Sequence, residues 1–186
     1  MIELKKFCKE DFPQLVKWIP DARFLLQWAG PNYTWPLDTQ QLNATLERTH
    51  GNQPAHYMFK AVDSATGEII GHIELVHVDY VQRAGHIGRV LVGPLELRGR
   101  GFGKQIISEL IAFAFCELDF QTLTINVFDF NKAGIGCYTS MGFRHVEFKK
   151  NVRQLGDEYW NIMLMQLDRV EENCIAGKNT TLRGTS

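Results

Sequence analysis

The sequence contains no long apolar segment. No run approaches the ~20 apolar residues that a membrane-spanning helix needs, and the first residues, MIELKKFCKEDF, lack the apolar stretch of a signal peptide. Cysteine is scarce, since only four are scattered along the chain and no two form a CxxC pair. We therefore expect a cytoplasmic protein with reduced thiols, and no disulfide, zinc site or membrane partner.

An excess of charge is also missing. The chain has 20 Lys and Arg against 21 Asp and Glu, a net charge of −1, so nucleic acid is not an expected partner. There is no internal repeat and no low-complexity linker. With 186 residues, 45% of them hydrophobic, the chain can bury one substantial core. We expect one domain at residues 1–167, followed by a polar tail at 168–186.

The spacing of apolar residues predicts both strands and helices, with a period of two for strands and of 3.6 for helices. Strands are expected at 2–7, 56–63, 68–79, 83–92, 122–128, 143–152 and 158–167. Helices are expected at 12–19 with Asp11 as N-cap, after residue 21, from Asp38 or Thr39 to 48, and at 101–118 and 131–141. This gives the order β-α-α-β-β-β-α-β-α-β-β and an α/β (α+β) fold with a mixed, mostly antiparallel sheet flanked by helices.

The most informative segment is VLVGPLELRGRGFGK, residues 90–104, in which a strand ends, a glycine-rich turn follows and a helix begins. Glycines let backbone N–H groups approach a ligand, and a helix N-terminus attracts phosphate. Arginine and lysine add positive charge there. The candidate phosphate ligands are Arg98, Gly99, Arg100, Gly101, Phe102, Gly103 and Lys104.

Other interpretations of this turn stay open. The P-loop pattern G-x-x-x-x-G-K-[ST] is absent because Gln105 follows Lys104. No ribose-binding acid completes a dinucleotide fingerprint either, although a nucleotide enzyme is a third hypothesis. A plain solvated turn would also use glycine and arginine.

Two motifs in order resemble the GNAT superfamily of acyl-CoA N-acyltransferases. Arg98-x-x-Gly101-x-Gly103 after a Val-Leu-Val strand resembles its coenzyme A pyrophosphate loop. Residues 131–143, NKAGIGCYTSMGF, resemble its N-x-x-A-x-x-x-Y-x-x-x-G-F segment. In this chain Pro94 lies one residue farther from the arginine than is usual, and Gly134 replaces the usual alanine. Glycine inside a helix costs ~1 kcal/mol relative to alanine.

The resemblance implies the co-substrate and its contacts. Acetyl-CoA would lay its pantetheine arm along Val90, Leu91 and Val92, which would pair with it as a strand does, in a splay between this strand and the strand at 122–128. The N–H of Val92 would bind the thioester carbonyl oxygen. Asn131 is an N-cap, and in the family it also contacts the cofactor arm.

Tyr138 is the candidate proton donor to the leaving thiolate, because a phenol and a thiol are of comparable basicity; simple aromatic packing is the alternative. Glu74 is the first candidate for the base that takes a proton from the amine. A carboxylate within the strand GEIIGHIELVHV is unusual. The other candidates are His72, His77, His86 and His145, or no single base.

The acceptor side is expected from the N-terminal helices, as in the family. Trp28, Tyr33 and Trp35 are candidates to line an aromatic cleft, and core packing explains them equally well. The sequence therefore predicts an N-acetyltransferase that acts on a small amine, a peptide N-terminus or a lysine, with a homodimer allowed. The alternative is a coenzyme A-binding sensor or interaction module with weak catalysis.

Overall fold

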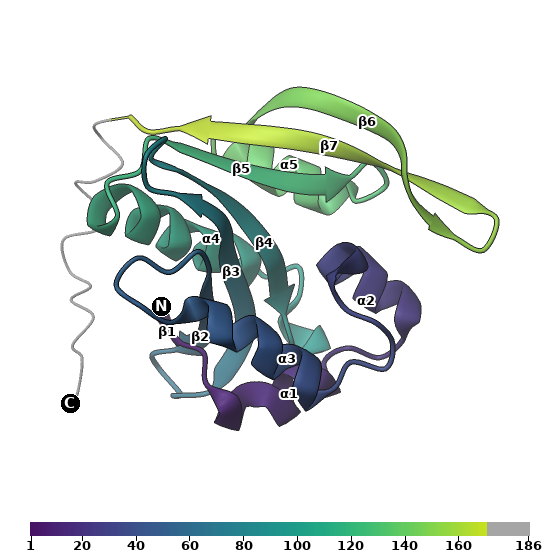
Figure 1. Cartoon of the computed structure of the whole chain (residues 1–186), viewed down its shortest axis with the longest axis horizontal. Coiled ribbons are helices and arrows are strands. Elements are labelled where there is room, and N and C mark those ends of the chain that lie inside the picture. Colours follow the sequence, from purple (N-terminus) through teal and green to yellow (C-terminus); the bar gives the residue numbers. More distant parts are fainter. Residues whose placement is uncertain (171–186) are drawn as a thin grey trace.

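The computed structural model describes residues 1–170, and within them seven strands form one sheet in the order β1-β2-β3-β4-β5-β7-β6 (Figure 1). The strands are β1 (Ile2–Lys6), β2 (Tyr57–Asp63), β3 (Ile69–Asp79), β4 (Ala84–Val92), β5 (Thr122–Phe128), β6 (Arg144–Leu155) and β7 (Glu158–Asp168). The helices are α1 (Phe12–Lys17), α2 (Ala22–Ala29), α3 (Thr39–Leu46), α4 (Phe102–Ala112) and α5 (Lys132–Ser140). The predicted fold class is confirmed.

Neighbouring strands pair antiparallel wherever a short turn connects them. The β2–β3–β4 meander forms as predicted. Its first turn closes with a hydrogen bond from the Gly67 N–H to the Asp63 carbonyl oxygen at 2.7 Å, and Gly67 has a φ of 76°, which favours glycine. Only the β4–β5 pair is parallel, because α4 carries the chain across the sheet between these strands.

The helices cover the two faces of the sheet. Helices α4 and α5 lie on one face, and α1, α2 and α3 lie on the other side, around β1 to β4 (Figure 1). The side chains of Ile106, Ile107 and Leu110 on α4 are at most 1% exposed. The second core is built on Leu15, Leu25 and Leu42 of the N-terminal helices, together with Met58 and Leu91 from the sheet.

The two halves of the sheet separate between β4 and β5. Their parallel pairing runs from Ala84–Thr122 to Ile87–Ile125 and then stops. At the same point β4 has a bulge against β3, and Arg89 adopts a φ of 51°. A bulge bends its strand, so β4 turns away from β5 and the predicted splay is present (Figure 1).

The structure departs from the predicted elements in three places. The three helices expected from the individual segments all lie between β1 and β2, so the predicted element order, which has two there, is short by one helix. Asp11 makes no cap hydrogen bond to α1, because its carboxylate instead accepts from Lys60 Nζ at 2.8 Å and from the Cys8 N–H at 2.8 Å. Helix α4 ends at Ala112, and a π-helical turn, Phe113–Glu117, completes the predicted segment.

Two further sequence predictions concern the C-terminal tail and membrane-spanning helices. Strand β7 ends at Asp168, and most of the predicted tail, residues 171–186, lies outside the described residues. Within residues 1–170, no helix is both long enough and apolar enough to cross a membrane.

Candidate active site

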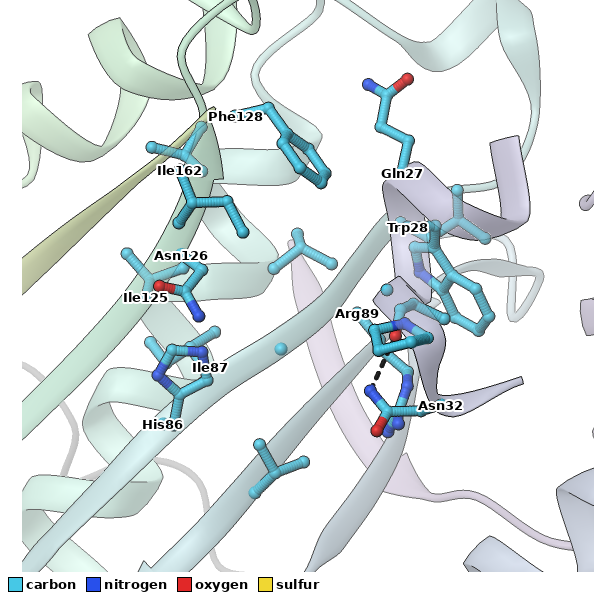
Figure 2. A pocket seen from close by; sticks show the side chains of 18 of the residues that line it. Gln27, Trp28, Asn32, His86, Ile87, Arg89, Ile125, Asn126, Phe128 and Ile162 are labelled. Carbon is cyan, nitrogen blue, oxygen red and sulfur yellow. Dashed lines mark hydrogen bonds between the residues drawn. The ribbon is translucent and has the colours of Figure 1, made fainter. Parts of the chain in front are cut away.

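A cleft of about 400 Å³ lies where β4 and β5 separate. Its walls come from α2 and the turn after it, from β3 and β4, and from β5, α5, β6 and β7. Side chains of β5 and β7, including Asn126, Phe128 and Ile162, face Gln27 and Trp28 of α2 across it (Figure 2). The cleft thus depends on a sheet that has opened, with helix α2 beside the opening.

Of the three predicted aromatic residues, only Trp28 lines the cleft. Tyr33 is 8% exposed and stacks against Trp28 with 6.3 Å between the rings, while its hydroxyl group bonds to Thr45 Oγ1 at 2.9 Å. Tyr33 therefore supports Trp28 from behind. Trp35 is 47% exposed and does not line the cleft, so the structure does not bring it to the site.

Glu74 is completely buried and lies in a polar cluster with His56, His72 and Arg89. One carboxylate oxygen accepts from His72 Nε2 at 2.9 Å, and the other accepts from His56 Nε2 at 2.5 Å and from the guanidinium group of Arg89. Burial acts to raise the pKa of Glu74, but Arg89 and the two histidines together hold the pKa well below its usual range. Glu74 is therefore an ionised anchor.

This geometry does not favour the prediction that Glu74 takes the proton from the amine. Its two oxygens are already occupied by three donors, and the carboxylate does not line the cleft. His56 does line it. A histidine whose one nitrogen is held by a carboxylate has a fixed tautomer, with its other nitrogen left as an acceptor. The role of Glu74 as the base stays a prediction, and its contact with His56 is one that positions the histidine at the cleft.

Two other candidate histidines also line the cleft. His77 and His86 have ring centroids 5.9 Å apart, and His86 Nδ1 lies 2.8 Å from Thr124 Oγ1. Burial, aided by the nearby His77, lowers the pKa of His86 to about 4. His86 is thus neutral at pH 7 and a weak base. His72 is buried behind Trp28 and His145 is exposed on β6, and neither lines the cleft.

Tyr138 on α5 borders the cleft from the β5 side. Burial, with a smaller effect of Cys137, raises the pKa of Tyr138 to about 12, so the phenol keeps its proton throughout the neutral range. Its hydroxyl group makes no hydrogen bond to any residue in the described part of the chain. A protonated, unengaged phenol at the cleft can serve as a proton donor.

Asn131 performs the predicted capping and also lines the cleft. Its Oδ1 accepts from the Gly134 N–H at 3.0 Å. A Cβ added to Gly134 would lie 2.7 Å from the Asn131 side-chain nitrogen. The departure from alanine at position 134 therefore has a steric reason, which is close approach of the cap.

The glycine-rich turn forms an open anion site on the surface. Gly99 and Gly101 have φ values of 73° and 86°, and a Cβ at either would meet nothing within 4 Å. No side chain among residues 1–170 caps the N-terminus of α4, which leaves the first N–H groups of this helix available to a ligand. Arg100 is exposed, and Lys104 Nζ reaches Ser140 Oγ at 3.2 Å.

Arg98 has a structural function in the turn. Its Nε donates to the Val92 carbonyl oxygen at 2.9 Å and its Nη2 to the Gly93 carbonyl oxygen at 3.2 Å. These bonds fix the turn to the end of β4, across the short 3₁₀ segment Leu95–Leu97, which separates Pro94 from Arg98. The guanidinium group thus holds the turn against β4, and its role as a phosphate ligand stays a prediction.

The last residues of β4 lie beyond its pairing with β5, and several of them line the cleft. Val90 and Leu91 line it and Val92 does not. The part of β4 from residue 88 onward has no partner on β5, so its backbone groups on that side are unpaired by the sheet. Val92, the predicted donor to the thioester carbonyl oxygen, is the next residue along β4 after Leu91, and its role stays a prediction.

Sequence reasoning missed several residues of the cleft wall, namely Arg48, His56, Arg89, Asn126 and Arg153. They come from separate segments, and none belongs to a recognisable motif. An arginine in the middle of the predicted strand at 83–92 was the one available signal, because a buried charge needs a partner such as Glu74.

Comparisons with known proteins agree with this geometry. A family model described as "Acetyltransferase (GNAT) domain" matches residues 2–144. The SPbeta prophage-derived N-acetyltransferase YokL of Bacillus subtilis is 33% identical over 87 residues, which are 47% of this chain and 48% of that protein. Spermidine N(1)-acetyltransferase of Vibrio cholerae is 26% identical over 82 residues, 44% of this chain and 46% of that one. The matches thus span about half of these relatives.

Solved structures with the same fold include spermidine N-acetyltransferase from Vibrio cholerae in complex with CoA and spermine. That structure has a TM-score of 0.77 at 17% identity and covers 90% of this chain and 95% of that one. A dodecameric structure of the Vibrio cholerae enzyme in an intermediate state has a TM-score of 0.71 at 18% identity, with 90% and 93% coverage. At this identity the likeness concerns the fold.

Proposed function

The chain belongs to the GNAT acetyltransferase family, and we propose that it is an N-acetyltransferase that moves an acetyl group from acetyl-CoA to a primary amine within a ternary complex. The observation that carries the proposal is the conjunction of an uncapped helix N-terminus at the glycine-rich turn with a splayed β4–β5 pair and an unengaged Tyr138 at the cleft.

The fit of this chain to coenzyme A supports the proposal. The amides of the turn and of the first turn of α4 suit the pyrophosphate, and the missing Cβ atoms of Gly99 and Gly101 leave it room. Val90 and Leu91 line the cleft on the part of β4 that has no partner on β5, so the β5 side of this segment suits the amides of the pantetheine arm. The structure of the Vibrio cholerae spermidine N-acetyltransferase, which has the same fold, is a complex with CoA and spermine and supports this assignment.

The chemistry is assigned to two side chains on opposite walls. His56, held by Glu74, accepts a proton from the ammonium group or from an intervening water, so that the free amine attacks the thioester carbonyl carbon. A new C–N bond forms, the C–S bond breaks, and Tyr138 gives its proton to the departing thiolate. The nitrogen then releases its second proton, which restores the hydroxyl group of Tyr138. An N–H of β4 stabilises the oxyanion that forms between these steps.

Free-thiol release from acetyl-CoA in the presence of a panel of amines tests the proposal. Tyr138→Phe should lower kcat by ~10²-fold or more and leave the KM for acetyl-CoA nearly unchanged. His56→Gln should lower kcat similarly. The control is Tyr159→Phe, whose side chain is exposed on β7 and should retain full activity.

Coenzyme A binding without thiol release with any amine would instead support the alternative, a coenzyme A-binding sensor or interaction module. Unchanged turnover of Tyr138→Phe would remove the proton donor from the scheme. The proposal also includes a cytoplasmic location, acetyl as the acyl group, and a homodimer; the dodecameric structure of the Vibrio cholerae enzyme shows that this relative assembles from several copies.

A further inference from the structure

The charge of the cleft wall is one-sided. Three arginines line it, Arg48, Arg89 and Arg153, and none of its lining residues is Asp or Glu. Glu74 lies behind the wall and is paired with Arg89. The positive charge of Arg89 is therefore compensated, and the other two arginines decide the electrostatic character of the cleft.

Arg48 and Arg153 have no ion pair with any residue among 1–170. Glu47, the acid next to Arg48 in the chain, instead contacts His50 Nδ1 at 3.3 Å. Arg153 on β6 donates through Nη1 to its neighbour, the Val152 carbonyl oxygen, at 2.6 Å. Its Nε is buried with no partner, which leaves a donor unsatisfied at a cost.

The position of Arg153 brings this charge across the cleft. The residue comes from the β6–β7 hairpin, yet a Cβ added to Gly30 in the turn after α2 would lie 3.5 Å from its Nη2. Gly30 has a φ of 61°. The hairpin is also fixed to α2 by two hydrogen bonds from Arg23 to Glu158, at 3.0 and 2.9 Å. The guanidinium group is thus held at the cleft beside α2.

Binding of the co-substrate phosphates does not require Arg48 and Arg153. The glycine-rich turn, with Arg100 and Lys104, supplies the phosphate site proposed above, and none of its residues lines the cleft. A polycationic acceptor would meet two uncompensated guanidinium groups and no carboxylate, which disfavours its binding. A guanidinium fork matches a carboxylate with two parallel hydrogen bonds.

We infer that the acceptor is a small primary amine that also carries an anionic group, in the simplest case a carboxylate bound by Arg153 and Arg48. This inference rests on the proposed function and specifies its substrate class. The amine would point toward His56, and the acid group would lie against the arginines beside the Gly30 turn.

A set of matched amines tests the inference with the full-length enzyme. Several α-amino acids are compared with the corresponding amino-acid amides and with spermidine, in the thiol-release assay. The amino acids should have at least ~10-fold higher kcat/KM than their amides, since a charge-assisted hydrogen bond is lost in each amide. The amine of the amino-acid amide is less basic, so a larger fraction of it is unprotonated at neutral pH. That difference favours the amide, so a preference for the amino acid cannot come from the fraction of free amine.

Arg153→Gln and Arg48→Gln should each raise the KM for the amino acid by about 10-fold and leave the KM for the amide and for acetyl-CoA unchanged. The control is Lys150→Gln, an exposed residue of the same strand β6 that does not line the cleft and should not change the preference. A thermal unfolding midpoint for each variant identifies any that fails to fold, in which case the matched amines on the native enzyme decide.

The outcomes separate the two proposals. Higher kcat/KM for spermidine or for the amides would overturn the inference and leave the acetyltransferase intact. Thiol release with no amine would refute the proposed function itself. If the arginine variants changed the preference between succinyl-CoA and acetyl-CoA but not between acceptors, the arginines would serve the acyl group, and the inference would be wrong.

Discussion

The glycine-rich turn at residues 98–104 and the cleft wall in front of Glu74 are two proposed binding regions that are built differently. The turn is a contiguous, solvent-exposed segment, and its geometry follows from glycines with positive φ and an uncapped helix. The wall is assembled from α2, β3, β4 and the residue before β2, His56, and the carboxylate of Glu74 behind it is completely buried. A substitution in the exposed turn should therefore affect ligand binding more than stability. A substitution in the buried cluster should affect both stability and catalysis.

The largest effect is expected in the wall. Glu74→Ala removes the one acid that compensates Arg89 and leaves the Nε2 atoms of His56 and His72 without a partner. Breaking a buried pair by removing one partner costs ~3–5 kcal/mol. Urea denaturation should detect a loss of this size, with activity abolished. The matched exposed change Glu147→Ala on β6 should cost ~0.5 kcal/mol or less.

A smaller loss for Glu74→Ala, with normal turnover, would mean that the cluster is neither structural nor catalytic. The proposed difference between the cleft wall and the turn would then be wrong for the residue where the largest effect is expected.

The second effect concerns pH. His86 has a pKa of about 4 in the folded protein, against ~6.5 for an unperturbed histidine, so the unfolded chain binds more protons between these values. Stability should therefore fall as the pH falls from 6.5 to 4, by up to ~3 kcal/mol from this residue. His86→Gln should flatten the pH dependence of the unfolding free energy in this window.

His145→Gln is the control, because His145 is exposed on β6 and its replacement should leave that pH dependence unaltered. An equally steep loss of stability in His86→Gln would assign the acid sensitivity to other groups.

The smallest effect on the fold is expected in the turn. Gly101→Ala places a Cβ on a residue with a φ of 86°, where nothing else lies within 4 Å. The backbone strain costs ~1–2 kcal/mol, and the affinity for coenzyme A, measured by calorimetry, should fall by about 10-fold because the first amides of α4 shift. Gly136→Ala, in open space on α5, should leave coenzyme A affinity intact and stabilise the helix by up to ~1 kcal/mol.

Unaltered coenzyme A affinity in Gly101→Ala would show that the turn does not carry the phosphate site. The cleft arginines could then bind the phosphates of coenzyme A, and the argument that they bind the acceptor would lose its basis.

The sequence alone determined the features that depend on neighbouring residues. Hydrophobic periodicity located the strands and helices, short turns implied the β2–β3–β4 meander, and the two motifs at 98–103 and 131–143 identified the family. Asn131 and Asp38 cap their helices as predicted. These features are local because hydrogen bonds within turns, caps and helices connect residues only a few positions apart.

The tertiary structure decided everything that required distant segments to meet. A carboxylate in a predicted strand says nothing about its partners, and only the fold brings His56, His72 and Arg89 to Glu74. The same holds for Arg153, which the long β6–β7 hairpin carries to the Gly30 turn. Burial and pairing of charge set the role of each of these side chains, and both depend on contacts between residues tens of positions apart in the chain.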